Sequence, residues 1–153
     1  MRPASPSILL VDDAVDERQM YADFFQALGF RTLQAGNALD ACRLAVELEP
    51  DAAVVDLVLP GMSGLELVHK LKSEDASSHI PVIALTGRTL SSDRRVAFAA
   101  GCDRFLEKPC LPDDLLTEIR ALLAESRRKR APRSRRYSTV TTARTLAADR
   151  ERD

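Results

Sequence analysis

The sequence predicts an α/β fold: a doubly wound sheet of five parallel strands with helices on both faces, built from five strand–helix repeats. Short apolar runs alternate with helical patterns over about residues 7–125. The run Ile8–Val11 is continuously apolar, as expected of a strand buried on both faces. A polar residue also stands where four of the five strands end. Strands that alternate with helices imply right-handed crossovers and a parallel sheet.

The first repeat combines a strand at Ile8–Val11 with a helix from about Ala14 to Leu28. Along this helix, three apolar residues follow the spacing i, i+4, i+8: Met20, Phe24 and Leu28. Gly29 then ends the helix, because glycine readily adopts the left-handed conformation found after a helix C-terminus.

The second repeat has a short strand, Arg31–Gln34, and a helix that Asn37 can cap. The apolar face of this helix consists of Ala41, Leu44, Ala45 and Leu48. Pro50 ends it, because the residue before a proline is disfavoured in the helical conformation.

The last three repeats follow the same pattern, and a turn-rich segment at 60–64 precedes the first of their helices. The strands are Ala52–Leu57, Val82–Thr86 and Asp103–Glu107, and the helices are about Leu65–Lys72, Ser91–Ala100 and Pro112–Glu125.

The charge of the chain changes sign near Ser126. Residues 1–126 hold 12 lysines and arginines against 20 aspartates and glutamates, a net charge of −8. Residues 127–153 hold 10 basic against 3 acidic residues, a net charge of +7. We therefore predict one folded domain over 1–126 and a basic, disordered tail over 127–153. Alternatively, this tail binds nucleic acid or a membrane surface, and such binding would weaken steeply with salt.

The composition favours a cytoplasmic protein. No apolar stretch approaches the ~20 residues that a membrane-spanning helix needs. The first residues lack the apolar core and cleavage site of a secretory signal. Three cysteines without metal-site spacing, Cys42, Cys102 and Cys110, are then expected to be reduced.

The polar residues at the strand ends predict a common site. Asp12 and Asp13 follow the first strand, Asp56 ends the third, Thr86 the fourth, and Lys108 follows the fifth. Because the carboxyl ends of parallel strands share one edge of the sheet, these side chains should converge there. Alternatively, Asp12-Asp13 alone could cap the first helix, and Asp56 alone could be a cap or turn residue. Three carboxylates, a hydroxyl and an ammonium together favour a site for a divalent metal and a phosphoryl group.

Four stretches of the chain resemble the receiver domain of two-component response regulators, the CheY-like family: Ile8–Asp13, Val54–Leu67, Pro81–Gly87 and Ala99–Pro109. The resemblance covers about residues 7–125, and it is specific because all the active-site residue types agree in spacing at once. It implies a CheY-like, flavodoxin-like (βα)5 fold and a signalling protein rather than an enzyme.

The resemblance also implies which residues act. Asp56 would accept a phosphoryl group, and Mg²⁺ would be held by Asp12, Asp13, Asp56 and the backbone carbonyl of Val58, two positions beyond Asp56. A phosphatase of the haloacid dehalogenase type is the competing enzyme hypothesis. Such an enzyme needs a second acid two residues after its nucleophile, where this chain has Val58.

A conformational switch would respond to phosphorylation: Thr86 would supply its hydroxyl, Phe105 its aromatic ring, and Lys108 the amine that senses phosphate. The peptide bond between Lys108 and Pro109 would be cis. The phosphoryl donor would be a sensor histidine kinase or a histidine phosphotransfer protein, and a downstream protein effector would read the result. The protein would be a monomer or a phosphorylation-dependent dimer. The roughly 27 residues after the last helix are too few for a separate DNA-binding output domain.

Overall fold

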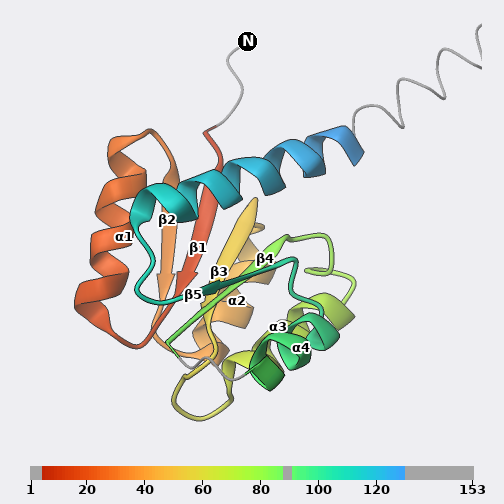
Figure 1. Ribbon diagram of the computed structural model, residues 1–153. Coiled ribbons are helices and arrows are strands. Elements are labelled where there is room, and N and C mark those ends of the chain that lie inside the picture. Colours follow the sequence, from red (N-terminus) through yellow and green to blue (C-terminus); the bar gives the residue numbers. More distant parts are fainter. Residues whose placement is uncertain (1–4, 88–90, 130–153) are drawn as a thin grey trace, which may run out of the picture.

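The computed structural model describes residues 5–87 and 91–129, and these form one sheet of five parallel strands covered by helices (Figure 1). The strand order is β2-β1-β3-β4-β5. The strands are β1 (Ser7–Val11), β2 (Arg31–Ala35), β3 (Ala52–Asp56), β4 (Val82–Thr86) and β5 (Arg104–Glu107). This confirms the predicted doubly wound α/β fold, and each strand begins and ends within one residue of its predicted range.

Helices cover both faces of the sheet, and two of them begin at a capping side chain. The helices are α1 (Val15–Ala27), α2 (Ala38–Leu48), α3 (Gly64–Ser73), α4 (Ser91–Ala100) and a C-terminal helix over 112–129. The side chain of Asn37 accepts a hydrogen bond from the backbone N–H of Asp40 at 2.8 Å, which confirms the predicted cap of α2. Ser63 caps α3 in the same way. Gly29, after α1, has a φ of +94° and confirms the predicted end of that helix.

Two hydrophobic cores lie on opposite faces of the sheet, because successive strand residues point to opposite sides. Ile8 and Leu10 of β1 pack with α1 and the C-terminal helix. Leu9 and Val11 pack with α2, α3 and α4. Figure 1 shows the same division, with α1 and the teal-to-blue C-terminal helix on one side of the strands and the other helices on the second side.

Of the apolar stripe predicted along the first helix, only Phe24 packs against the core. Met20 is 43% exposed and Leu28 46% exposed. The buried residues of α1 are instead Tyr21, Ala22 and Phe25. The helix offers apolar side chains on two neighbouring faces, and the core takes the face whose ring at Phe25 makes edge contacts with two other phenylalanines. In α2 the predicted Leu48 is likewise 52% exposed, at the last turn.

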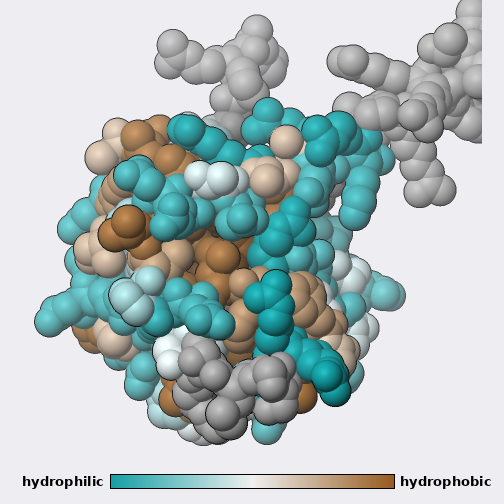
Figure 2. Space-filling model, viewed as in Figure 1, coloured by the Kyte–Doolittle hydropathy of each residue, from teal (hydrophilic) through white to brown (hydrophobic). Residues whose placement is uncertain are grey.

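The C-terminal helix is described through residue 129, three residues beyond the predicted domain end at Ser126. The rest of the predicted basic tail, 130–153, lies outside the described residues. Within the described ranges, no helix has the length and apolar character to cross a bilayer. On the face drawn in Figure 2, hydrophilic residues predominate and hydrophobic ones gather towards the middle of the view.

Candidate functional site: an acidic cluster at the carboxyl edge of the sheet

The strand register brings the predicted site residues to one edge of the sheet. Val11, the last residue of β1, pairs with Val55 of β3, and Thr86 of β4 pairs with Glu107 of β5. The residues that follow these positions therefore stand beside one another. Asp12 and Asp56 consequently end adjacent strands, although 44 positions separate them in the sequence.

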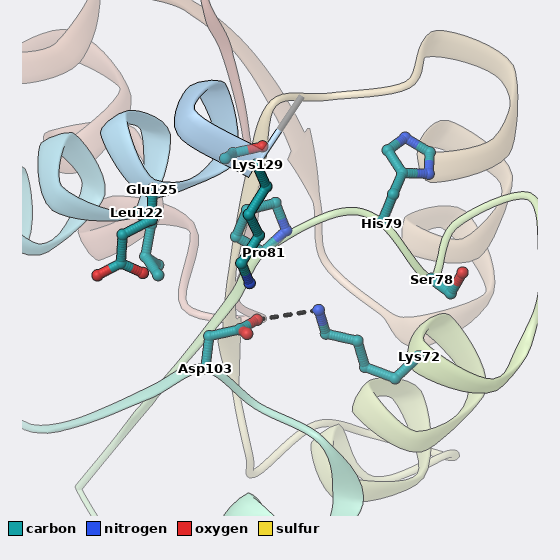
Figure 3. Close-up of a pocket in the computed structure, with 9 residues that line it drawn as sticks. Lys72, Ser78, His79, Pro81, Asp103, Leu122, Glu125 and Lys129 are labelled. Carbon is teal, nitrogen blue, oxygen red and sulfur yellow. Dashed lines mark ion pairs between the residues drawn. The ribbon is translucent and has the colours of Figure 1, made fainter. Parts of the chain in front are cut away.

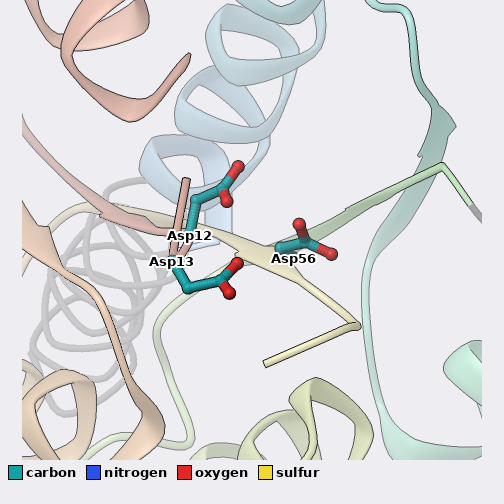
Figure 4. A group of neighbouring side chains, drawn as sticks. All are labelled: Asp12, Asp13 and Asp56. Atoms are coloured by element: carbon teal, nitrogen blue, oxygen red, sulfur yellow. The ribbon is translucent and has the colours of Figure 1, made fainter. Parts of the chain in front are cut away.

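Asp12, Asp13 and Asp56 form a cluster of carboxylates (Figure 4). One oxygen from each lies within 4.8 Å of the others. Asp12 and Asp56 are 6% and 8% exposed, whereas Asp13 is open to solvent. Carboxylates this close repel one another unless a cation compensates them, and carboxylate oxygens are the ligands that hard divalent cations prefer. The cluster could therefore hold a divalent metal ion.

Backbone N–H groups orient the two buried carboxylates. Oδ1 of Asp12 accepts a hydrogen bond from the backbone of Ala14 at 2.9 Å. Oδ1 of Asp56 accepts one from the backbone of Val58, also at 2.9 Å. Each acid thus has one oxygen held by its own loop and presents Oδ2 to the centre of the site. The predicted role of the Val58 carbonyl stays a prediction.

Lys108 reaches into this cluster from the loop after β5. Its Nζ lies 2.9 Å from Oδ2 of Asp12, 2.9 Å from Oδ2 of Asp56 and 3.1 Å from Oε2 of Glu17. Burial lowers the pKa of Lys108, but the hydrogen bonds that it donates to these carboxylates raise the pKa more, so that it lies above its usual value. Lys108 therefore stays protonated and supplies the positive charge in the cluster. The peptide bond to Pro109 is cis, as predicted.

Gly64 sets the distance between β3 and α3. A Cβ atom at this position would lie 2.2 Å from the carbonyl oxygen of Asp56 and 2.4 Å from the Cα of Leu57. The backbone N–H of Gly64 also donates to the carbonyl of Leu57 at 3.1 Å. The first turn of α3 thus packs directly on the backbone that carries Asp56, and only glycine permits that approach.

Thr86 and Phe105 lie beside the cluster but inside the fold. Thr86 is completely buried, and a cavity of about 40 Å³ borders it, with Val58 and Leu65 among its lining residues. Phe105 is 6% exposed and packs in the core under α4. The guanidinium of Arg94, from α4, lies 5.8 Å from the centre of its ring. Phe105 thus contacts α4, and the cavity beside Thr86 is also lined by Asp93 of α4.

Three residues at this edge were not foreseen from the sequence. Glu17 contacts Lys108, as described above. The guanidinium of Arg18 donates to the backbone carbonyl of Asp12 and to Oε1 of Gln34. Tyr21 donates its hydroxyl to the carbonyl of Cys110 at 2.7 Å. Glu17 and Tyr21 are four residues apart, so their spacing predicts that they share one face of the helix. Which residues this face contacts depends on how α1 is rotated about its axis, and the sequence does not indicate that rotation.

A larger cavity lies at the opposite end of the strands (Figure 3). Its volume is about 290 Å³, and its lining includes Lys72, His79, Asp103 and Glu125. Lys72 and Asp103 form an ion pair at 2.9 Å, and Asp103 also accepts from the backbone of Val82, next to the cavity. These charges are engaged in holding the starts of β4 and β5 together, so we assign the functional site to the acidic cluster.

Comparisons with known proteins agree with this geometry. A family model described as the response regulator receiver domain matches residues 8–120. The polar-differentiation response regulator DivK of Brucella anthropi is 32% identical over 120 residues, which cover 78% of this chain and 98% of DivK. The phosphate regulon transcriptional regulatory protein PhoB of Pseudomonas aeruginosa is 33% identical over 117 residues, which cover 76% of this chain and 51% of PhoB.

Solved structures give the same result. The CheY-like receiver domain protein from Methanospirillum hungatei superposes with a TM-score of 0.77 at 26% identity, covering 82% of this chain and 98% of that one. For the chemotaxis protein CheY4 of Vibrio cholerae the TM-score is 0.74 at 27% identity, with 78% and 99% covered. On its motifs, its strand order and these matches, the chain belongs to the response regulator receiver domain family.

Proposed function

We propose that the protein is a phosphorylation switch that accepts a phosphoryl group on Asp56 in a Mg²⁺-dependent reaction. The observation that carries the proposal is the meeting of Asp12, Asp13 and Asp56 with Lys108 at one edge of the sheet. Of the three acids, Asp56 ends the central strand β3 and turns Oδ2 towards the ammonium of Lys108. A phosphoryl group attached to Asp56 would therefore lie next to the positive charge of Lys108.

The acidic residues fit a magnesium ion. Asp12, Asp13 and Asp56 each offer an oxygen, and the carbonyl of Val58 is the proposed fourth protein ligand. Magnesium is typically bound by one or two carboxylates together with waters and a phosphate oxygen. When bound, Mg²⁺ would neutralise the charge of the phosphoryl oxygens during transfer.

The chemical step is a substitution at phosphorus. A carboxylate oxygen of Asp56 attacks the phosphorus of a phosphohistidine, so that a new P–O bond forms as the P–N bond to the imidazole breaks. The imidazole leaves with the bonding electron pair and takes a proton from solvent. Lys108 binds a phosphoryl oxygen of the acyl phosphate, because its ammonium is held next to Asp56. The protein is thus modified and does not turn over a substrate of its own.

The switch follows from the new charge. Thr86 would donate its hydroxyl to a second phosphoryl oxygen, and Phe105 would move into the space that Thr86 leaves. Phe105 lies under α4 and against Arg94, so its movement would alter the surface of α4, β5 and the C-terminal helix. Phosphorylation thus shifts the population of molecules between two packings of the Thr86 and Phe105 side chains.

The partners follow from the same chemistry. We infer that the donor is a sensor histidine kinase or a histidine phosphotransfer protein in the cytoplasm, and that a downstream protein reads the altered surface.

Phosphorylation by acetyl phosphate tests the proposal. With Mg²⁺ present, intact-protein mass spectrometry should detect one phosphoryl group on the wild type and none on Asp56→Asn. The control Asp75→Asn removes an exposed acid in the turn between α3 and β4 and should be phosphorylated like the wild type. Chelation of Mg²⁺ should abolish the modification. Equal modification of wild type and Asp56→Asn would refute the assignment.

A further inference from the structure

Glu17 is the third carboxylate bound to Lys108, and the proposed phosphorylation does not use it. Its Oε2 lies 3.1 Å from Nζ, against 2.9 Å for the oxygens of Asp12 and Asp56. The contact is built into the fold, because Glu17 shares one face of α1 with Tyr21 and Phe25, both of which are buried. That face is turned towards the loop after β5, where Tyr21 contacts Cys110.

The three carboxylates use the full hydrogen-bonding capacity of Lys108. A lysine ammonium has three N–H donors and no acceptor. In this structure the donors go to Asp12, Glu17 and Asp56. A phosphoryl group on Oδ2 of Asp56 ends the contact with that oxygen and frees one donor, but Asp12 and Glu17 still hold the ammonium. Because the phosphoryl oxygens lie beyond Oδ2, Lys108 can follow them outward only by loosening one of these two remaining contacts.

Of the two partners that remain after phosphorylation, Glu17 is released with the smaller penalty. The side chains of Asp12 and Asp56 are 9% and 11% exposed, and their other oxygens are held by backbone N–H groups. The side chain of Glu17 is 33% exposed and stands in the first turn of α1. Water can therefore solvate its carboxylate when the ion pair opens, whereas desolvated carboxylates lose more when they lose a partner.

We propose that Glu17 competes with the phosphoryl group for Lys108 and so holds the protein in its unphosphorylated state. This inference rests on the proposed phosphorylation of Asp56 and adds a regulating residue to it. The stronger the ion pair between Glu17 and Lys108, the less readily Lys108 turns to the modified Asp56. Glu17 is thus a positioning residue, since it acts through Lys108 and does not touch the reacting atoms.

Beryllofluoride, which mimics a phosphoryl group on a carboxylate, provides the test. Its affinity is measured by isothermal titration calorimetry at saturating Mg²⁺. Glu17→Gln should bind beryllofluoride about three- to tenfold more tightly than the wild type, the range expected for loss of one partly exposed competing ion pair. Glu17→Asp keeps the charge but is one methylene shorter and withdraws from Lys108, so it should also bind more tightly.

The control is Asp16→Asn, which removes an equal charge from the neighbouring exposed residue without touching Lys108. Its affinity should match that of the wild type. The proposal is overturned if Glu17→Gln binds no more tightly than the wild type. It is equally overturned if only the variants that remove charge, Glu17→Gln and Asp16→Asn, bind more tightly, because the effect would then be one of net charge.

The proposed function can fail separately. If Asp56→Asn binds beryllofluoride as the wild type does, or the wild type does not bind it, the phosphorylation site itself is wrong and the role of Glu17 falls with it. If Asp56→Asn abolishes binding while the Glu17 variants bind like the wild type, phosphorylation stands and only the competition is refuted. Thermal unfolding of each variant without metal shows whether it is folded.

Discussion

Tyr21 ties the first helix to the loop that presents Lys108. Its hydroxyl donates to the carbonyl of Cys110, two residues beyond Lys108, and its ring is buried. Burial, together with the nearby acidic groups, raises the pKa of Tyr21 to about 12. The contact keeps the loop after β5 against α1, and the position of the ammonium depends on that loop.

We predict that Tyr21→Phe lowers the free energy of unfolding by about 1–2 kcal/mol, because the carbonyl of Cys110 loses its partner. The pKa shift gives this contribution a pH dependence. The native-state pKa is raised above that of the unfolded chain, so the stability is fully present below about pH 10 and is lost as the pH rises towards 12. Urea unfolding at several pH values measures both effects.

Because the wild type and Tyr21→Phe both keep Lys108, the difference between their free energies of unfolding reports the contribution of the Tyr21 hydroxyl. The wild type should lose more stability than Tyr21→Phe between neutral and strongly alkaline pH. Parallel curves for the two proteins would show that the hydroxyl is not held as described.

The junction of β3 and α3 is the element that positions the phosphoacceptor. Asp56 ends the strand, and α3 begins at Gly64 in direct backbone contact with it. A helix normally gains stability when a glycine becomes alanine. Here the new Cβ would overlap backbone atoms, which cannot move aside as a flexible side chain can.

We predict that Gly64→Ala lowers the free energy of unfolding by about 2–3 kcal/mol through this overlap and weakens binding of Mg²⁺ by displacing Asp56. The matched control is Gly87→Ala, whose Cβ would lie 4.0 Å from the nearest atom, Cβ of Lys108. That variant should unfold within about 1 kcal/mol of the wild type. Denaturant unfolding and Mg²⁺ titration of both variants test the prediction, and equal stability of the two would contradict it.

At the scale of the whole molecule, the site could be predicted because it depends on topology. Continuous apolar runs such as Ile8–Val11 identify the strands, and parallel strands leave their carboxyl ends on one edge. The meeting of Asp12, Asp56 and Lys108 at one edge can be predicted from this topology alone. The adjacent acids Asp12 and Asp13 also indicated a metal site and not a helix cap alone, and in the structure both lie close to Asp56.

The contacts around the site could not be predicted because they depend on how α1 is rotated about its axis. The pattern Met20, Phe24 and Leu28 is as regular as the one that is buried. Packing against the C-terminal helix selects the other face, and with it the stripe of Glu17, Tyr21 and Phe25. Nothing in the order of residues indicates that an acid in the first turn of a helix meets Lys108, 91 positions away.

The most direct test is a crystal structure of the protein with Mg²⁺ and beryllofluoride. We expect one metal ion ligated by Asp12, Asp13 and Asp56, with beryllofluoride on Asp56 and its fluorine atoms in contact with Thr86 and Lys108. A metal ion bound away from these three acids, or beryllofluoride attached to another side chain, would contradict the proposed phosphorylation of Asp56.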